Sequence, residues 1–179
     1  MKQKILIVVD MQNDFVGGVL GTDEAKIILP AVREEIISAE QTGKKIFFTR
    51  DTHSADYLHT REGEKLPVEH CIQYSEGWNL VSEIADLVKN PSQIIDKETF
   101  GSRKLGEMLA EENRSMPIEE IELIGVCTDI CVISNALLLK AFLPETRICV
   151  NSNCCAGSSP EHHDLALDAM KLCQIDIIE

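Results

Sequence analysis

The chain has 179 residues, of which 44% are hydrophobic and 26% are charged. These proportions are typical of a soluble globular protein rather than a disordered one, and the length predicts one domain over residues 1–179. The formal net charge of −13 argues against nucleic-acid binding, because phosphate contacts require a basic surface. It argues equally against an anionic membrane surface, and no apolar run is long enough to span a bilayer.

The first ten residues, MKQKILIVVD, do not have the pattern of a secretory signal. Their apolar run is too short, and it ends at Asp10 without a small-residue cleavage site. The chain has seven cysteines, an odd number, and most of them lie in apolar segments. We therefore expect a cytoplasmic protein with reduced thiols rather than a disulfide framework.

Taken in chain order, short apolar runs alternate with segments that have helical spacing. The runs that predict strands are residues 4–10, 44–51, 92–96, 119–126, 146–152 and 175–179. The segments that predict helices are residues 24–43, 102–113, 129–143 and 159–173. Nearly continuous, β-branched hydrophobicity suits parallel strands that are covered on both faces. The pattern predicts an α/β fold: a three-layer α/β/α domain with a mostly parallel, Rossmann-like sheet of about six strands.

Two of the predicted helices carry signals for where they begin. In the first, Pro30 lies in the middle of the helical spacing, which predicts that the regular helix begins near it. In the last, Ser159 precedes Pro160 and Glu161. This is the pattern of an N-cap, a proline at the first helical position and an early acidic residue.

One region breaks the alternation, because residues 51–79 form a long polar connection directly after the second predicted strand. So long a connection inside a compact domain is usually functional or mobile. Ligands of parallel α/β sheets bind beyond the carboxyl ends of the strands. Asp10, Lys97 and Cys127 also lie at or just past predicted strand ends. We therefore expect the reactive side chains to gather at that one edge of the sheet.

The stretch GVCTDICV, residues 125–132, places Cys127 and Cys131 four positions apart. A structural zinc site requires a second pair of ligands with suitable spacing, which the sequence lacks, and a disulfide is not expected in a reducing compartment. Cys127 is most simply a core residue. Thr128 or Asp129 is expected to cap a helix with Cys131 in its first turn, where N–H groups and the helix dipole stabilise a thiolate.

A thiolate of this kind performs acyl chemistry only with a proton-transfer partner and a site that binds an oxyanion. Asp10 and Lys97 are the candidate partners; each alone is better explained as a turn-capping aspartate or a surface lysine, but together with Cys131 they form a coherent site. In the polar connection, Asp51, His53 and His70 offer carboxylate and imidazole donors, which suit Zn²⁺, Fe²⁺ or Mn²⁺. The alternative is a charged, solvated loop with structural histidines.

Four motifs follow one another over nearly the whole chain: IVVDMQNDF (7–15), TRDTH (49–53), IIDKETFGS (94–102) and GVCTDICV (125–132). They resemble the isochorismatase-like cysteine hydrolases, and in particular the nicotinamidases and pyrazinamidases. The resemblance implies that Cys131 is the nucleophile, Asp10 the general acid/base and Lys97 the residue that keeps both charged. It also implies a cis peptide between Val126 and Cys127, so that the N–H groups of Cys127 and Cys131 point at the developing oxyanion.

The resemblance further implies one divalent metal ion that binds the ring nitrogen of the substrate and positions it. Zinc is expected first, with iron or manganese as alternatives. The implied ligands are Asp51, His53 and His70. The fourth ligand is expected to be Glu62, with His59 as its rival.

The substrate-binding side chains are expected to differ from those usual in this family. Its members often have an aromatic residue just before the last metal-binding histidine, where this chain has LPVEH. Contacts with a substrate ring are therefore expected from Phe15, Tyr57 and Phe100, each of which also suits plain packing in the core or in a lid.

These features predict cysteine-dependent hydrolysis of a small amide, with nicotinamide converted to nicotinate and ammonia through a thioester on Cys131. A related hydrolase that acts on a ureide or an N-carbamoyl amide is the alternative. A non-catalytic metal- or redox-binding module built on Cys127 and Cys131 is a more distant one, because it leaves Asp10 and Lys97 without a role. Members of this family commonly self-associate, so a homo-oligomer is expected.

Overall fold

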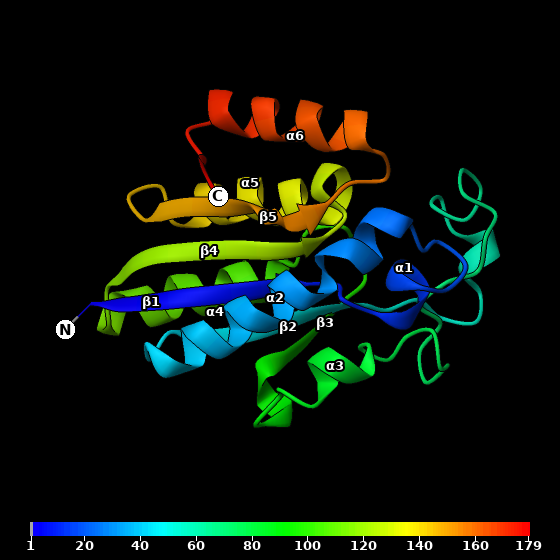
Figure 1. The fold of residues 1–179 in the computed structure, drawn as a ribbon, viewed down its shortest axis with the longest axis horizontal. Coiled ribbons are helices and arrows are strands. Elements are labelled where there is room, and N and C mark those ends of the chain that lie inside the picture. Colours follow the sequence, from blue (N-terminus) through cyan, green and yellow to red (C-terminus); the bar gives the residue numbers. More distant parts are fainter. Residues whose placement is uncertain (1) are drawn as a thin grey trace.

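The computed structural model describes residues 2–179, and Figure 1 shows its fold. One sheet of six strands has the order β3-β2-β1-β4-β5-β6. The strands are β1 (Gln3–Val9), β2 (Lys45–Asp51), β3 (Ile94–Lys97), β4 (Ile118–Val126), β5 (Arg147–Ala156) and β6 (Asp176–Ile178). Every neighbouring pair in this sheet is parallel. The predicted α/β fold is therefore confirmed, with a sheet that is parallel throughout.

Helices cover both faces of the sheet (Figure 1). They are α1 (Asn13–Val16), α2 (Asp23–Gln41), α3 (Ser82–Ala85), α4 (Arg103–Ser115), α5 (Ile133–Phe142) and α6 (Pro160–Leu172). Shorter turns are the 3-10 segments η1 (Tyr57–His59) and η2 (Pro91–Gln93) and the π-type turn η3 (Thr128–Val132). Within residues 2–179, no helix combines the length and the apolar character that crossing a membrane requires.

Alternation along the central strands divides the core into two halves. On β1, Ile5 and Ile7 belong to the buried cluster that contains the inward faces of α4, α5 and α6. Leu6 and Val8 point the other way, into the cluster that contains the inward faces of α1, α2 and α3. Because apolar side chains are buried on both faces, the strands are hydrophobic along nearly their whole length.

Helix α2 begins at Asp23, so the expectation that it begins near Pro30 is wrong. Thr22 caps the helix, and its side chain accepts a backbone hydrogen bond from the first turn. Pro30 lies inside the helix, where the loss of one backbone donor is offset by the burial of residues such as Val32 against the sheet. The expected start of α6 is confirmed, with Ser159 as its N-cap.

The strand order brings together segments that are far apart in the sequence. Asp51 pairs with Lys97 where β2 lies beside β3. Val9 pairs with Gly125 where β1 lies beside β4. The carboxyl ends of these four adjacent strands are therefore neighbours, and Asp10 and Cys127 directly follow β1 and β4. This edge is where the sequence predicts the reactive side chains to gather.

Gly125 allows β4 to lie close to β1 just before this edge. Its φ of +115° lies in a region that side chains rarely adopt. An added Cβ would be 2.1 Å from the carbonyl oxygen of Val9. Gly43, after α2, also has a positive φ, of +75°, but an added Cβ there would have no neighbour within 4 Å.

We predict that Gly125→Ala lowers the free energy of unfolding by about 3 kcal/mol or more, because backbone strain and overlap with β1 act together. Gly43→Ala is the matched control and is expected to lose only ~1 kcal/mol, since it has the strain alone. Urea denaturation measures both values. Equal losses in the two variants would show that the contact with Val9 does not constrain β4.

Candidate active site

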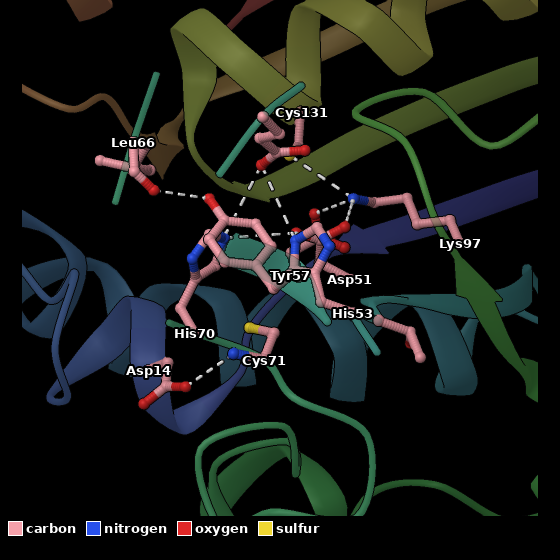
Figure 2. Close-up of polar contacts among 12 residues, drawn as sticks. Asp14, Asp51, His53, Tyr57, Leu66, His70, Cys71, Lys97 and Cys131 are labelled. Carbon is pink, nitrogen blue, oxygen red and sulfur yellow. Dashed lines mark hydrogen bonds and ion pairs between the residues drawn. The ribbon is translucent and has the colours of Figure 1, made fainter. Parts of the chain in front are cut away.

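A buried ammonium group lies at the centre of the carboxyl edge. The Lys97 Nζ is 2.7 Å from Asp10 Oδ2 and 3.0 Å from Asp51 Oδ1. On its other side the Cys131 Sγ is 3.5 Å away. All four residues are buried, and Figure 2 shows Lys97 between Asp51 and Cys131. The structure thus brings together the three residues, Asp10, Lys97 and Cys131, for which the sequence predicts joint chemistry.

Both oxygens of the Asp10 carboxylate have a partner. Its Oδ1 accepts a hydrogen bond from the Thr49 hydroxyl at 2.6 Å. Its Oδ2 forms the ion pair with the Lys97 ammonium. Burial raises the pKa of Asp10, and the positive charge of Lys97 opposes this increase without cancelling it. The result is a carboxylate that is more basic than usual.

Burial has an effect on the ionisation of Cys131 that the sequence does not indicate. Burial, followed by the negative charge of Asp10, raises the pKa of the Cys131 thiol well above its usual range. For Lys97, burial works against the charged form, but Asp10, Cys131 and Asp51 outweigh it and raise the pKa of the ammonium. Burial thus disfavours the Cys131 thiolate, whereas the neighbouring Lys97 ammonium favours it, so the ionisation of the two groups is linked.

Cys131 lies in the π-type turn η3, which leads into α5. The expectation that Thr128 or Asp129 caps this helix is wrong, because neither side chain bonds to the first turn. The Thr128 hydroxyl instead pairs with His163 Nδ1 at 2.8 Å. Asp129 accepts hydrogen bonds from the backbone and hydroxyl of Ser158, at 2.8 and 2.6 Å. Both side chains thus tie the Cys131 turn to the start of α6.

The peptide bond between Val126 and Cys127 is cis, as the resemblance implies. It lies where β4 passes into η3. Cys127 is half-buried and contributes to the pocket wall described below. Burial, with the charges of Asp129 and Asp10, raises the pKa of its thiol to about 12.

A second group of side chains lies on the far side of Asp51. Asp51, His53, Glu62 and His70 each offer one donor atom, and these atoms lie within 4.8 Å of one another. His53 Nε2 is 3.0 Å from Asp51 Oδ2 and 3.7 Å from Glu62 Oε1. His70 Nε2 is 3.9 Å from the same two oxygens. Two carboxylates and two imidazoles form a donor set that suits Zn²⁺, Fe²⁺ or Mn²⁺.

The orientation of His70 fits a metal ligand. Its Nδ1 lies 2.8 Å from the Val68 carbonyl oxygen, so this nitrogen carries the proton and donates it. Nε2 is then left as the free donor atom that faces the cluster, as is usual for metal-binding histidines. His59, the rival of Glu62, lies outside the cluster: its side chain is 81% exposed and pairs with Asp56 at 2.8 Å. The structure therefore places Glu62, not His59, in the fourth position.

A cavity of about 310 Å³ joins the two groups of side chains. Phe15 and Phe100 line it, as the sequence predicts for residues that contact a substrate ring. Tyr57 does not, because its ring packs behind the cluster, 4.6 Å from the ring of His53 and 4.9 Å from that of His70. Its hydroxyl donates a hydrogen bond to the Leu66 carbonyl at 3.0 Å (Figure 2). The full lining is Phe15, Leu20, Thr22, Asp51, Glu62, Leu66, His70, Phe100, Cys127, Ile130, Cys131 and Ser158.

Two supporting residues were not found by sequence reasoning. Gln12 is fully buried and clamps Asp51: its amide nitrogen donates to the Asp51 carbonyl at 2.9 Å, and its amide oxygen accepts from the Asp51 N–H at 2.6 Å. Asp14 accepts a hydrogen bond from the Cys71 N–H at 2.8 Å and so fixes the residue after His70 (Figure 2). The sequence signal for both residues is the run of polar side chains in MQNDF, residues 11–15, directly after the first apolar strand.

Fold and site together are those of a hydrolase with a buried cysteine at the carboxyl edge of a parallel sheet. The model of the Isochorismatase domain matches residues 4–179, and the chain belongs to this family. The pyrazinamidase of Pyrococcus horikoshii, solved in complex with zinc, is 30% identical, with a TM-score of 0.80 and 99% of each chain covered.

Two further solved structures have a similar fold, at different levels of sequence identity. The pyrazinamidase/nicotinamidase of Streptococcus mutans is 29% identical, with a TM-score of 0.82 over 98% of this chain and 100% of that one. The N-carbamoylsarcosine amidase of Thermoplasma acidophilum is 22% identical, with a TM-score of 0.76 over 99% of this chain and 96% of that one. At that identity the likeness shows the shared fold and nothing about the substrate.

We predict that His70→Ala weakens Zn²⁺ binding at least ~100-fold, because it removes one of the four converging donors. His59→Ala is the matched control, since it removes an exposed histidine of the same connection, and it is expected to bind Zn²⁺ like the unchanged protein. Competition with a chromophoric chelator measures both affinities. Equal weakening in the two variants would contradict the assignment of the cluster.

Proposed function

We propose that this protein is a cysteine amidohydrolase that converts nicotinamide and water to nicotinate and ammonia. The observation that carries the proposal is the buried Lys97 ammonium, which contacts both the Cys131 thiol and the Asp10 carboxylate. The cavity beside Cys131 is also lined by residues of the metal-type cluster, which consists of Asp51, His53, Glu62 and His70. An isolated cysteine or an isolated ion pair would not support acyl transfer; the combination does.

The first step is transfer of the Cys131 proton to Asp10. The carboxylate is suited to this role, because burial raises its pKa. Lys97 stays positively charged beside both groups and stabilises the thiolate as it forms. The thiol therefore need not be ionised before the substrate binds. The protons of these interacting groups belong to the set rather than to any single residue.

The thiolate then attacks the carboxamide carbon, and the carbonyl oxygen becomes an oxyanion that the N–H groups of Cys127 and Cys131 bind. Asp10 returns the proton to the nitrogen, ammonia leaves, and the acyl group remains on Cys131 as a thioester. A water molecule, deprotonated by Asp10, attacks the thioester. Nicotinate leaves and the thiol regains its proton, so that one water is consumed for each amide.

Asp51, His53, Glu62 and His70 are the residues that would hold a divalent metal ion. When bound, the ion supplies a Lewis acid for the ring nitrogen of the substrate. Phe15 and Phe100 line the cavity where the ring would lie, and Phe100 is partly exposed at the surface. Binding at the ring end and attack at the amide end are in this way assigned to different residues.

The alternative substrates are ureides and N-carbamoyl amides. Among the described residues that line the cavity, the charged ones are Asp51 and Glu62, and none is a lysine or an arginine. Outside the candidate metal cluster, the described lining residues offer no lysine or arginine to pair with the carboxylate of an N-carbamoyl amino acid, which favours a neutral amide. A redox or metal module built on Cys127 and Cys131 is disfavoured too, because it gives no role to the Lys97 ammonium that contacts Cys131 or to the Asp10 carboxylate paired with that ammonium. Cytoplasmic location and self-association stay predictions.

We predict that Cys131→Ala lowers the rate of ammonia release from nicotinamide at least about a thousandfold, because the residue that forms the thioester is lost. Cys127→Ala is the matched control. It is expected to keep activity within about tenfold, since only its backbone is assigned a role.

Removal of metal with a chelator should raise KM, with recovery when Zn²⁺ is added back. Activity that survives in Cys131→Ala, or an inert metal-loaded protein, would contradict the proposal.

A further inference from the structure

Asn135 is a buried polar residue in the otherwise apolar start of α5. It lies four residues after Cys131, on the face of the helix that points into the protein with Ala136 and Leu139. A buried amide costs free energy unless its donors and acceptor find partners. The partners of Asn135 therefore show what the side chain holds together.

The side chain of Asn135 makes three hydrogen bonds, all to backbone groups. Its amide nitrogen donates to the carbonyl oxygen of Cys131 at 2.8 Å and to that of Phe100 at 3.1 Å. Its amide oxygen accepts from the N–H of Ser102 at 2.9 Å. Both donors and the acceptor are thus used, and a flipped amide would place like groups against one another. The side chain has a single orientation that suits all three partners.

These bonds connect the turn of the nucleophile to the loop between β3 and α4, residues 98–102. That loop starts directly after Lys97 and contains Phe100 of the cavity wall. Gly101 lies close against α5, since an added Cβ would be 3.0 Å from the Ser134 carbonyl oxygen. The loop is therefore held directly on α5, the helix that follows the turn of Cys131.

We propose that Asn135 is a positioning residue: it locks the Cys131 turn against the β3–α4 loop and so sets the separation between the Cys131 thiol and the Lys97 ammonium. The inference rests on the proposed role of Cys131 as nucleophile. A π-type turn departs from the regular helical ladder, so the carbonyl of Cys131 gains a fixed partner from a side chain. Small displacements of reacting groups are costly, which is why such a lock affects rate.

The test uses two variants of the full-length protein and a readout that does not require the proposed substrate. Asn135→Leu removes all three hydrogen bonds at similar volume. Asn135→Asp keeps the acceptor for Ser102 and removes both donors. The first readout is the rate at which iodoacetamide alkylates Cys131 in the folded protein, followed by peptide mass spectrometry, with the exposed Cys173 as the internal standard. The second is the steady-state hydrolysis of nicotinamide.

Both variants are expected to slow alkylation of Cys131 about tenfold or more, with Cys173 unchanged, and to lower kcat by a similar factor while KM changes less. The control is Thr146→Val, which removes a buried hydrogen bond to the Ile118 carbonyl, made at 3.2 Å just before β5 begins. It should lower Tm without changing either rate. Gly101→Ala, which pushes the same loop away, should act in the same direction as the Asn135 variants but more weakly.

Folded Asn135→Asp protein whose Cys131 is alkylated at the unchanged rate would overturn the proposal. If Asn135→Leu does not fold, Asn135→Asp and Gly101→Ala decide the question. Alkylation needs no amide substrate, so the two proposals can fail separately. If the protein is inert on nicotinamide but the variants still slow alkylation, the proposed substrate is contradicted and the role of Asn135 is supported. An equal change in Thr146→Val would show instead that the alkylation rate does not depend specifically on the contacts of Asn135.

Discussion

The site depends on one buried positive charge, the ammonium of Lys97. A buried charge is tolerated only when it is paired, and loss of one partner of such a pair typically costs about 3–5 kcal/mol. Lys97 has two carboxylate partners, Asp10 and Asp51, and it also touches Cys131. The same ammonium thus satisfies the carboxylates and stabilises negative charge that develops on sulfur. Stability and the proposed chemistry use the same contacts.

The position of Lys97 follows from the order of the strands. β3 is the edge strand beside β2, so Lys97 at its end faces Asp51 at the end of β2. Asp51 points one carboxylate oxygen to Lys97 and the other to His53. Asp51 therefore belongs both to the set of residues around Lys97 and Cys131 and to the metal-type cluster. Gln12 clamps its backbone from the other side. The two halves of the site cannot shift independently, because one carboxylate belongs to both.

Much of this architecture could be predicted from the sequence, because it depends on patterns that are local in the chain. Continuous apolar runs indicate buried parallel strands, and strand ends then bring Asp10, Asp51, Lys97 and Cys127 to one edge without any knowledge of tertiary contacts. The choice of Glu62 over His59 came from a family resemblance, and the structure agrees by leaving His59 exposed.

The errors have a common physical cause: long-range partners override local preference. Thr128 and Asp129 are good capping residues, but they bond to residues of the β5–α6 connection and of α6 instead. Tyr57 lies in the right connection, yet its ring packs behind the histidines rather than in the cavity. The raised pKa of Cys131 comes from burial and Asp10, which a helix N-terminus alone does not reveal. The partners of Thr128, Asp129 and Cys131 are distant in the sequence, so no local pattern indicates them. Tyr57 packs against His53, only four residues away, but the sequence does not show on which side of the histidines its ring lies.

The central claim is that Cys131 becomes acylated during turnover. The most direct measurement is mass spectrometry of the metal-loaded protein, mixed with saturating nicotinamide and quenched in acid at intervals from the first turnover onward. The account predicts a nicotinoyl group on the peptide that contains Cys131, and on no other cysteine. Steady release of ammonia with Cys131 unmodified at every interval, or an acyl group on another residue, would contradict it.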